Sequence, residues 1–236
     1  MERIQKVIAE SGIASRRGAE KLINECKVYV NGELATIGQK VSGNDEIVVN
    51  GNKIKKEDKV YFLLNKPRSV ICSNDDPEKR KSVVDLIQTD KRIYPIGRLD
   101  YDTTGAIILT NDGELANILM HPKNEIERVY YAKVEGFVTK DELNRLRKGI
   151  LIDNKICKAY NAKMKKYNKA SDKSYVSITL KEGHNHEVKN IFASINHPVV
   201  KLKREVFAGF DITNMKSGEY RVLNPKEVKL LYALKK

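Results

Sequence analysis

The segment from Gly97 to Gly113 constrains the fold of this chain more than any other stretch. Its apolar run, Ala106 to Leu109, follows Gly105 and precedes the turn residues Asn111-Asp112-Gly113. A short apolar run bounded by turn signals on both sides predicts a buried strand. The Thr- and Gly-rich turn that precedes the run therefore lies at the N-terminal end of that strand.

Asp100 lies in this turn, two residues after Arg98. The position suits a carboxylate held at the rim of a pocket beside a fixed cation. This arrangement suggests a catalytic role for Asp100. The alternative is that Asp100 or Asp102 accepts backbone N–H groups in an Asx turn, a common role of Asp before Thr and Gly. Taken by itself, the segment leaves both interpretations open.

The composition sets the class of protein. The chain has 236 residues, 41% of them hydrophobic, enough for one large domain or two unequal ones. No stretch approaches the roughly 20 apolar residues that cross a bilayer, and the start lacks the apolar part of a secretory signal. We expect a cytoplasmic monomer with no membrane partner.

Metal and disulfide sites are not indicated. Cys26, Cys72 and Cys157 are odd in number and far apart, which fits neither a disulfide framework nor a CxxC metal site. His184 and His186 with Glu187 lack an obvious further ligand. We therefore predict that the chain holds no metal.

The positive charge is concentrated at the end of the chain. Of a net charge of +13, most comes from residues 155–236, which carry 18 Lys and Arg against 7 Asp and Glu. A basic surface attracts polyanions, and nucleic acid is the usual one in a cytoplasm. A solvated lysine-rich face is the alternative.

The first 57 residues form a module of two helices and a small sheet in our interpretation, and the polar stretch 51–58 would be a linker. Ser15 is placed to cap the second helix, and the pairs Asn31-Gly32 and Asn50-Gly51 predict tight turns. Arg16 and Arg17 fall in the first turn of that helix, where cations oppose the helix dipole and a phosphate partner would offset the cost.

The stretch SRRGAEKLINECKVYVNG, residues 15–32, resembles the S4 RNA-binding domain. The resemblance implies that Arg16 and Arg17 bind RNA. Cys26 stands where that family commonly has Gly.

Two further residues of the second module have competing interpretations. Tyr130 shares a strand face with Ala132 and Val134, so its ring is either core or a stacking partner for a base. Lys189 lies one step off the apolar face of a helix that starts at Val188, and either reaches solvent or pairs with a buried carboxylate.

Four segments in order resemble the RsuA-type family of ribosomal RNA pseudouridine synthases. They are NKPR at 65–68, GRLDYDTTGAIILTNDGELA at 97–116, RVYYAKVEG at 128–136 and EGHNHEVKNIFASINHPVVKLKR at 182–204. Ser69 stands where Gly usually follows the first segment. His184, His186 and Asn190 stand where the family often has Arg.

The resemblance implies a role for individual residues. Asp100 matches the catalytic aspartate, Tyr130 the base-stacking tyrosine and Lys189 the basic residue that pairs with the aspartate. Arg98 completes the RLD motif, and we expect RNA contacts from Arg98 and also from Lys66 and Arg68. Asp102 is expected only to shape the turn.

The implied fold is α+β, with an S4-like RNA-binding domain at 1–57 and a pseudouridine synthase domain at 58–236. The second domain would have a mixed, largely antiparallel sheet flanked by helices. The implied activity converts uridine to pseudouridine in ribosomal RNA without a cofactor, with 23S RNA of the large subunit as the expected target. Asp100 would attack the sugar or the base, or remove a sugar proton, and these routes stay open.

Other functions fit parts of this sequence. A small-subunit 16S target and a catalytically idle RNA-binding ribosome-assembly factor remain alternatives. A hydrolase acting on a glycosidic bond would usually need a second catalytic carboxylate, and none stands at a clear spacing from Asp100.

Overall fold

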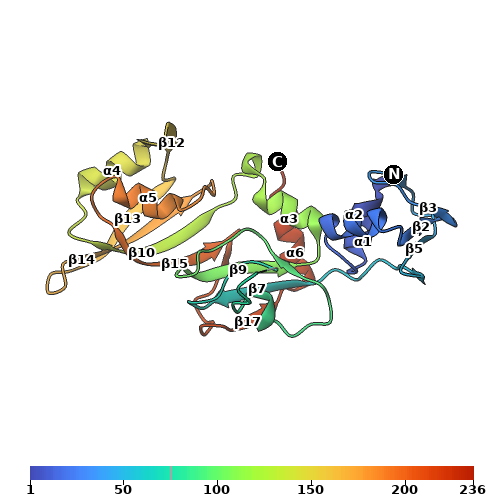
Figure 1. The fold of residues 1–236 in the computed structure, drawn as a ribbon. Helices are drawn as coiled ribbons and strands as arrows, with labels where there is room; N and C mark the ends of the chain where they lie inside the picture. Colours follow the sequence, from blue (N-terminus) through green and yellow to red (C-terminus); the bar gives the residue numbers. More distant parts are fainter. Residues whose placement is uncertain (75) are drawn as a thin grey trace. The chain divides into compact units, whose positions relative to one another are not determined.

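The computed structural model describes residues 1–74 and 76–236, and the chain divides into two compact units (Figure 1). The smaller unit comprises 1–60, 89–93 and 111–113, and the larger unit comprises 61–88, 94–110 and 114–236. The predicted domain boundary at 57/58 lies close to the first of these divisions and stays a prediction. Among the described helices, none is long and apolar enough to span a membrane.

The smaller unit contains the helix pair and small sheet that its sequence predicts. Helices α1 (Ile4–Glu10) and α2 (Arg16–Asn24) pack through buried Ile4, Ile8 and Ala19. Ser15 caps α2 as predicted, because its Oγ accepts a hydrogen bond from Gly18 N at 3.0 Å. The strands are β1 (Glu2–Arg3), β2 (Val28–Val30), β3 (Glu33–Leu34), β4 (Lys40–Val41), β5 (Ile47–Val49) and β6 (Asn52–Lys53).

The end of α2 shows what Cys26 does in place of glycine. Its φ is 55°, in the left-handed region, and Lys27 N donates to Leu22 O while Cys26 N donates to Ile23 O. These two bonds are those of a Schellman motif, which favours Gly at this position. Cys26 lies beyond the helix and is exposed.

The stretch 51–58 is not purely a linker. Asn52 and Lys53 form β6 against β5, and Ile54 packs against the core of the smaller unit. Glu57 N also donates to Glu10 O at 3.2 Å. This polar stretch, which we predicted to be a linker, therefore includes a strand at the edge of the small sheet.

The larger unit is built on one mixed sheet with the strand order β13-β14-β10-β15-β9-β7-β17. Neighbouring strands are antiparallel except β15 and β9, which are parallel, so the predicted mixed, largely antiparallel sheet is confirmed. The strands are β7 (Tyr61–Lys66), β9 (Thr104–Thr110), β10 (Arg128–Glu135), β13 (Asn161–Asn168), β14 (Lys173–Leu180), β15 (Val199–Phe207) and β17 (Tyr220–Val222), with β8 (Tyr94–Pro95) and β16 (Phe210–Asp211) at its side. A hairpin, β11 (Ile150–Ile152) and β12 (Lys155–Cys157), stands apart from it.

Helices of the larger unit cover the sheet through two apolar clusters. One cluster joins β10, β13 and β14 to α4 (Lys140–Lys148) and α5 (Glu187–Ala193), and the other joins β7 and β9 to α3 (Gly113–Met120) and α6 (Pro225–Tyr232). Short 3-10 turns lie at Val84–Leu86 and Pro122–Asn124. A capping box formed by Thr139 and Glu142 starts α4.

Gly105 permits the close approach that joins the two halves of this sheet. It lies opposite Arg204 in the parallel pair β9 and β15, with a φ of +116°. A Cβ at this position would lie 2.1 Å from the carbonyl oxygen of Arg204. The residue must therefore be glycine both for its backbone angle and for space.

We predict that Gly105→Ala lowers the free energy of unfolding by about 3 kcal/mol, because angle strain and the clash with backbone add together. Gly209→Ala is the matched control: its φ is +85° but no atom lies within 4 Å of the added Cβ. It should cost only about 1 kcal/mol. Urea unfolding followed by circular dichroism compares the two, and equal losses would show that the close approach carries no cost.

Candidate active site

The turn between β8 and β9 presents Asp100 at the rim of a hollow. Thr103 N donates to Asp100 O at 3.1 Å, which closes the turn. Leu99, on the preceding position, is buried and its N–H points to Cys72 Sγ at 3.4 Å. The Asp100 side chain stays 27% exposed, so its carboxylate is accessible from the hollow.

Lys66 holds this turn from beneath. It is the last residue of β7 and fully buried, and its Nζ donates to the carbonyl oxygens of Thr103 at 2.8 Å and of Asp100 and Pro67 at 3.1 Å. Three carbonyls satisfy the three N–H donors of an ammonium group. Burial lowers the pKa of Lys66. The predicted RNA contact for Lys66 is wrong on this geometry, because a phosphate cannot reach a buried ammonium whose donors are used.

Lys189 holds the carboxylates of the same turn from above. It lies near the start of α5, and its Nζ is 2.8 Å from Asp100 Oδ2 and 2.9 Å from Asp102 Oδ1. The structure thus brings together Asp100 and Lys189, as the resemblance implies. The expectation that Asp102 only shapes the turn is wrong, since its carboxylate also binds this lysine.

These contacts shift the pKa values of Lys189 and Asp102. Burial acts to lower the pKa of Lys189, but hydrogen bonds to Asp100 and Asp102 outweigh it, and the pKa lies above its ordinary value. The hydrogen bond from Lys189 lowers the pKa of Asp102. Both shifts favour the charged forms of Lys189 and Asp102.

Tyr130 forms a wall of the hollow. It shares a face of β10 with buried Ala132 and Val134, as the period-two pattern predicts, and packs in part against their cluster. It is only half-buried, and it lines the hollow together with Asp100. Both interpretations of Tyr130 therefore hold in part: it touches the core, and it faces the hollow.

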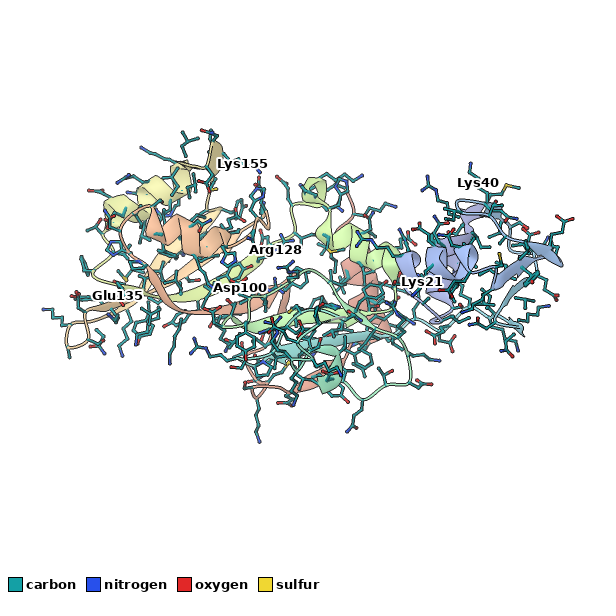
Figure 2. The ribbon with its side chains drawn as sticks, in the orientation of Figure 1. Lys21, Lys40, Asp100, Arg128, Glu135 and Lys155 are labelled. Atoms are coloured by element: carbon teal, nitrogen blue, oxygen red, sulfur yellow. The ribbon has the colours of Figure 1, made fainter. Side chains whose placement is uncertain are left out.

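The hollow has two regions in the larger unit that share lining residues, and Figure 2 labels Asp100 and Arg128, which line it. The larger region has a volume of about 470 Å³ and the smaller about 60 Å³. Both are lined by Arg98, Asp100, Tyr130, Gly183, His184 and His186. The larger region adds the cations Arg128, Lys181 and Arg204, whereas the smaller adds Thr103 and Lys189. A carboxylate and an aromatic ring thus share one basic cavity.

Arg204 is a lining residue that the sequence analysis missed. It is 2% exposed, its Nε donates to Ala106 O at 2.7 Å, and its guanidinium lies 4.5 Å from the centre of the Phe207 ring. Arg128 approaches the same ring at 5.6 Å. Among the described residues Arg204 Nη2 has no hydrogen-bond partner, and neither arginine forms an ion pair. A residue that lines the hollow therefore has one buried donor without a partner among the described residues.

The other predicted RNA contacts lie at the surface. Arg98 is exposed and lines the hollow, and Arg68 is exposed with its Nε donating to Asp102 O at 3.2 Å. Arg16 and Arg17 are exposed in the first turn of α2, in the smaller unit. Ser69, which stands in place of the family's glycine, has a φ of 60°.

The His and Glu residues beside the hollow form a hydrogen-bonded cluster. Glu182, His184 and Glu187 bring their ligand atoms within 4.8 Å of one another, a set that could hold a metal ion. Two hydrogen-bonding contacts lie inside this set, because His184 Nε2 lies 2.8 Å from Glu182 Oε2, and Glu187 Oε2 accepts from His184 N at 3.0 Å. His186 lies apart from the set, with Nδ1 3.8 Å from Asp100 Oδ2.

Comparison with known proteins decides what this arrangement belongs to. The family model of RNA pseudouridylate synthase matches residues 60–194, and that of the S4 domain matches residues 2–47. Over 236 residues the chain is 50% identical to ribosomal large subunit pseudouridine synthase B of Bacillus subtilis (strain 168), covering 99% of this chain and 97% of the relative. The chain belongs to the RNA pseudouridylate synthase family.

Other members of the family agree along nearly the whole chain. The dual-specificity RNA pseudouridine synthase RluF of Escherichia coli (strain K12) is 35% identical, with 98% of this chain and 79% of the relative covered. A crystal structure of a pseudouridylate synthase superposes with a TM-score of 0.69 at 31% identity, and covers 98% of this chain and 100% of that one. The predicted family, the S4 domain and the α+β class are therefore confirmed.

The buried Glu187 at the start of α5 gives a test by pH. Burial raises the pKa of Glu187, so between its unfolded and folded values the folded protein binds more protons than the unfolded chain. The free energy of unfolding then falls as pH rises through that window. We predict that Glu187→Gln removes this fall and is more stable than wild type at pH 7, because the amide still accepts from His184 N.

Urea unfolding between pH 4 and 8 measures the effect, with Glu182→Gln as the matched control because Glu182 is exposed in the same cluster. An unchanged pH dependence in Glu187→Gln would contradict the assignment of a raised pKa to this group.

Proposed function

We propose that this enzyme isomerises one uridine of large-subunit 23S ribosomal RNA to pseudouridine, with Asp100 as its catalytic group. The observation that carries the proposal is the Asp100 carboxylate, accessible from a basic hollow and bound by Lys189 at 2.8 Å. Isomerisation of ribosomal RNA uridines follows from membership of the family. The large-subunit target rests on the 50% identity to the synthase from Bacillus subtilis over nearly the whole length of both chains.

The reaction places few demands on the protein beyond one carboxylate. The N1–C1′ bond of uridine breaks, the base turns within the site, C5 bonds to C1′, and the proton lost from C5 is balanced by one gained at N1. No electrons leave the nucleoside and no group is added, so the reaction needs no cofactor. A carboxylate can attack the sugar or the base or remove a sugar proton, and the ion pair with Lys189 would orient Asp100 for each route.

The target base must leave its stack to reach Asp100. We propose that the ring of Tyr130 stacks on the extruded base, since it lines both regions of the hollow and is not fully covered. Arg98, Arg128 and Arg204 line the same hollow and would hold the phosphates of the displaced nucleotides. The unused donor of Arg204 supports this role, because an anion would satisfy it.

The remaining parts of the proposal concern further RNA contacts, the oligomeric state and the cellular location. Arg16 and Arg17 on the S4-like domain 1–57 would bind a second part of the RNA, and Arg68 would add a contact beside the turn. One chain supplies Asp100, Tyr130 and Lys189, which supports action as a monomer. We place this action in the cytoplasm, with ribosomal RNA as the partner.

Pseudouridine mapping of ribosomal RNA tests the proposal. In cells without the gene, we expect one pseudouridine of 23S RNA to be missing and wild type to restore it. Asp100→Asn should fail to restore it and should slow single-turnover conversion in vitro by roughly 10³-fold or more. Asp102→Asn is the matched control, since Asp102 binds the same lysine but does not line the hollow, and it should retain activity within about tenfold.

Each other result has a definite meaning. Restoration by Asp100→Asn would contradict the catalytic assignment. Loss of a pseudouridine from 16S RNA would move the target to the small subunit. An unchanged pseudouridine map, together with a defect in ribosome assembly, would favour an RNA-binding assembly factor.

A further inference from the structure

The four strands β13, β14, β10 and β15 have one covered face and one open face. Side chains such as Ala132, Val176 and Leu202 point to the covered face, where they pack with α4 and α5 in one apolar cluster. Figure 1 shows both helices on the same side of these strands. No helix of the described chain packs on the other side, and Figure 2 shows side chains including Glu135 extending from it.

The open face combines lysines with two tyrosines at its centre. Tyr131 on β10 lies opposite Ser177 of β14 and Lys203 of β15, and its ring centre is 5.9 Å from that of Tyr175 with 34° between the planes. Both rings are half-buried. The strand registers place on this face Lys133, Lys163, Lys166, Lys173, Lys201 and Lys203.

The six lysines of this face outnumber the carboxylates beside them, which are Glu135 and Glu205, the latter close enough to add to the effect of burial in raising the pKa of Tyr131. Within the described part of the chain only Lys173 of the six lysines forms an ion pair, with Glu135. Lys133 and Lys201 are directly opposite each other on β10 and β15, which is a destabilising arrangement for like charges. The Lys133 ammonium lies 5.7 Å from the centre of the Tyr175 ring instead of beside a carboxylate. A polyanion would offset the repulsion.

We propose that this open face is a second RNA-binding surface, which holds a single-stranded segment of ribosomal RNA. Half-buried tyrosine rings on the two central strands offer stacking surfaces to bases, and the surrounding lysines offer contacts to phosphates. A duplex hides the faces of its bases, so the rings favour a single strand. By analogy, RNA recognition motifs use the same arrangement of a four-stranded sheet with aromatic residues on the open face and helices on the other.

This surface is distinct from the proposed active site. Tyr130 and Tyr131 are adjacent in β10 and therefore point to opposite faces of the sheet. The strand held on the open face is consequently a different segment from the one whose uridine enters the hollow. The proposal does not depend on the role of Asp100.

Binding of a fluorescent 12-nucleotide oligouridylate to the full chain tests the proposal. Lys133→Gln with Lys201→Gln should weaken binding about tenfold at 150 mM salt and reduce the slope of log K against log salt by roughly 0.7 for each lost phosphate contact. Tyr131→Leu with Tyr175→Leu should weaken binding about tenfold or more and leave that slope unchanged. Lys140→Gln with Lys148→Gln on α4 is the matched control, with the same change of charge on the covered side, and should bind as wild type does.

Two further measurements keep the result interpretable. Thermal unfolding by circular dichroism checks that each variant folds, and conversion of a minimal stem-loop substrate should stay within about twofold of wild type, because the hollow is untouched. The proposal is overturned if sheet variants lose no more affinity than the α4 control. It is also overturned if the sheet variants lose as much affinity for a duplex RNA as for the single strand. If a polyglutamate peptide competes with the oligouridylate and the tyrosine variants bind as wild type does, the partner is an acidic protein and the proposal is again overturned.

Discussion

The candidate site depends on one buried ammonium. Lys66 is fully buried at the end of β7, and its three hydrogen bonds tie Pro67, Asp100 and Thr103 to one point. Burying a cation without a carboxylate is unfavourable unless all its donors are used, and burial accordingly lowers its pKa. Because the three carbonyls must stay in place to satisfy it, the turn that carries Asp100 has little freedom to move.

This constraint explains how the two halves of the sheet make one site. Strand β7 supplies Lys66, which binds the backbone of the turn, and the turn leads directly into β9 at Thr104. Helix α5 supplies Lys189, which binds the Asp100 carboxylate. The parallel contact of β9 with β15 joins the halves, and it is possible because Gly105 has no Cβ. Asp100 is thus fixed through its backbone by one lysine and through its carboxylate by another, while Tyr130 of β10 faces the same hollow.

Local patterns in the sequence predicted local structure well. The apolar run after Gly105, the cap at Ser15 and the helical spacing from Val188 all have their physical cause within a few residues. The clamp formed by Lys66 could not be predicted in this way, because two of its acceptors lie 34 and 37 residues further along the chain. Strand β15 was not predicted either, since charged Arg204 occupies one of its buried positions. The family resemblance, and not periodicity, assigned Asp100, Tyr130 and Lys189 to one site.

The most direct test of this account is the Lys66→Met variant, with single-turnover conversion and RNA affinity measured on the same stem-loop substrate. Lys66 holds the turn without reaching the surface, so we expect the rate to fall by about 10²-fold or more while the Kd stays within about twofold of wild type. Circular dichroism would show that the variant remains folded. A wild-type rate in the folded variant, or a weakened Kd with an intact rate, would contradict the claim that this buried lysine positions Asp100.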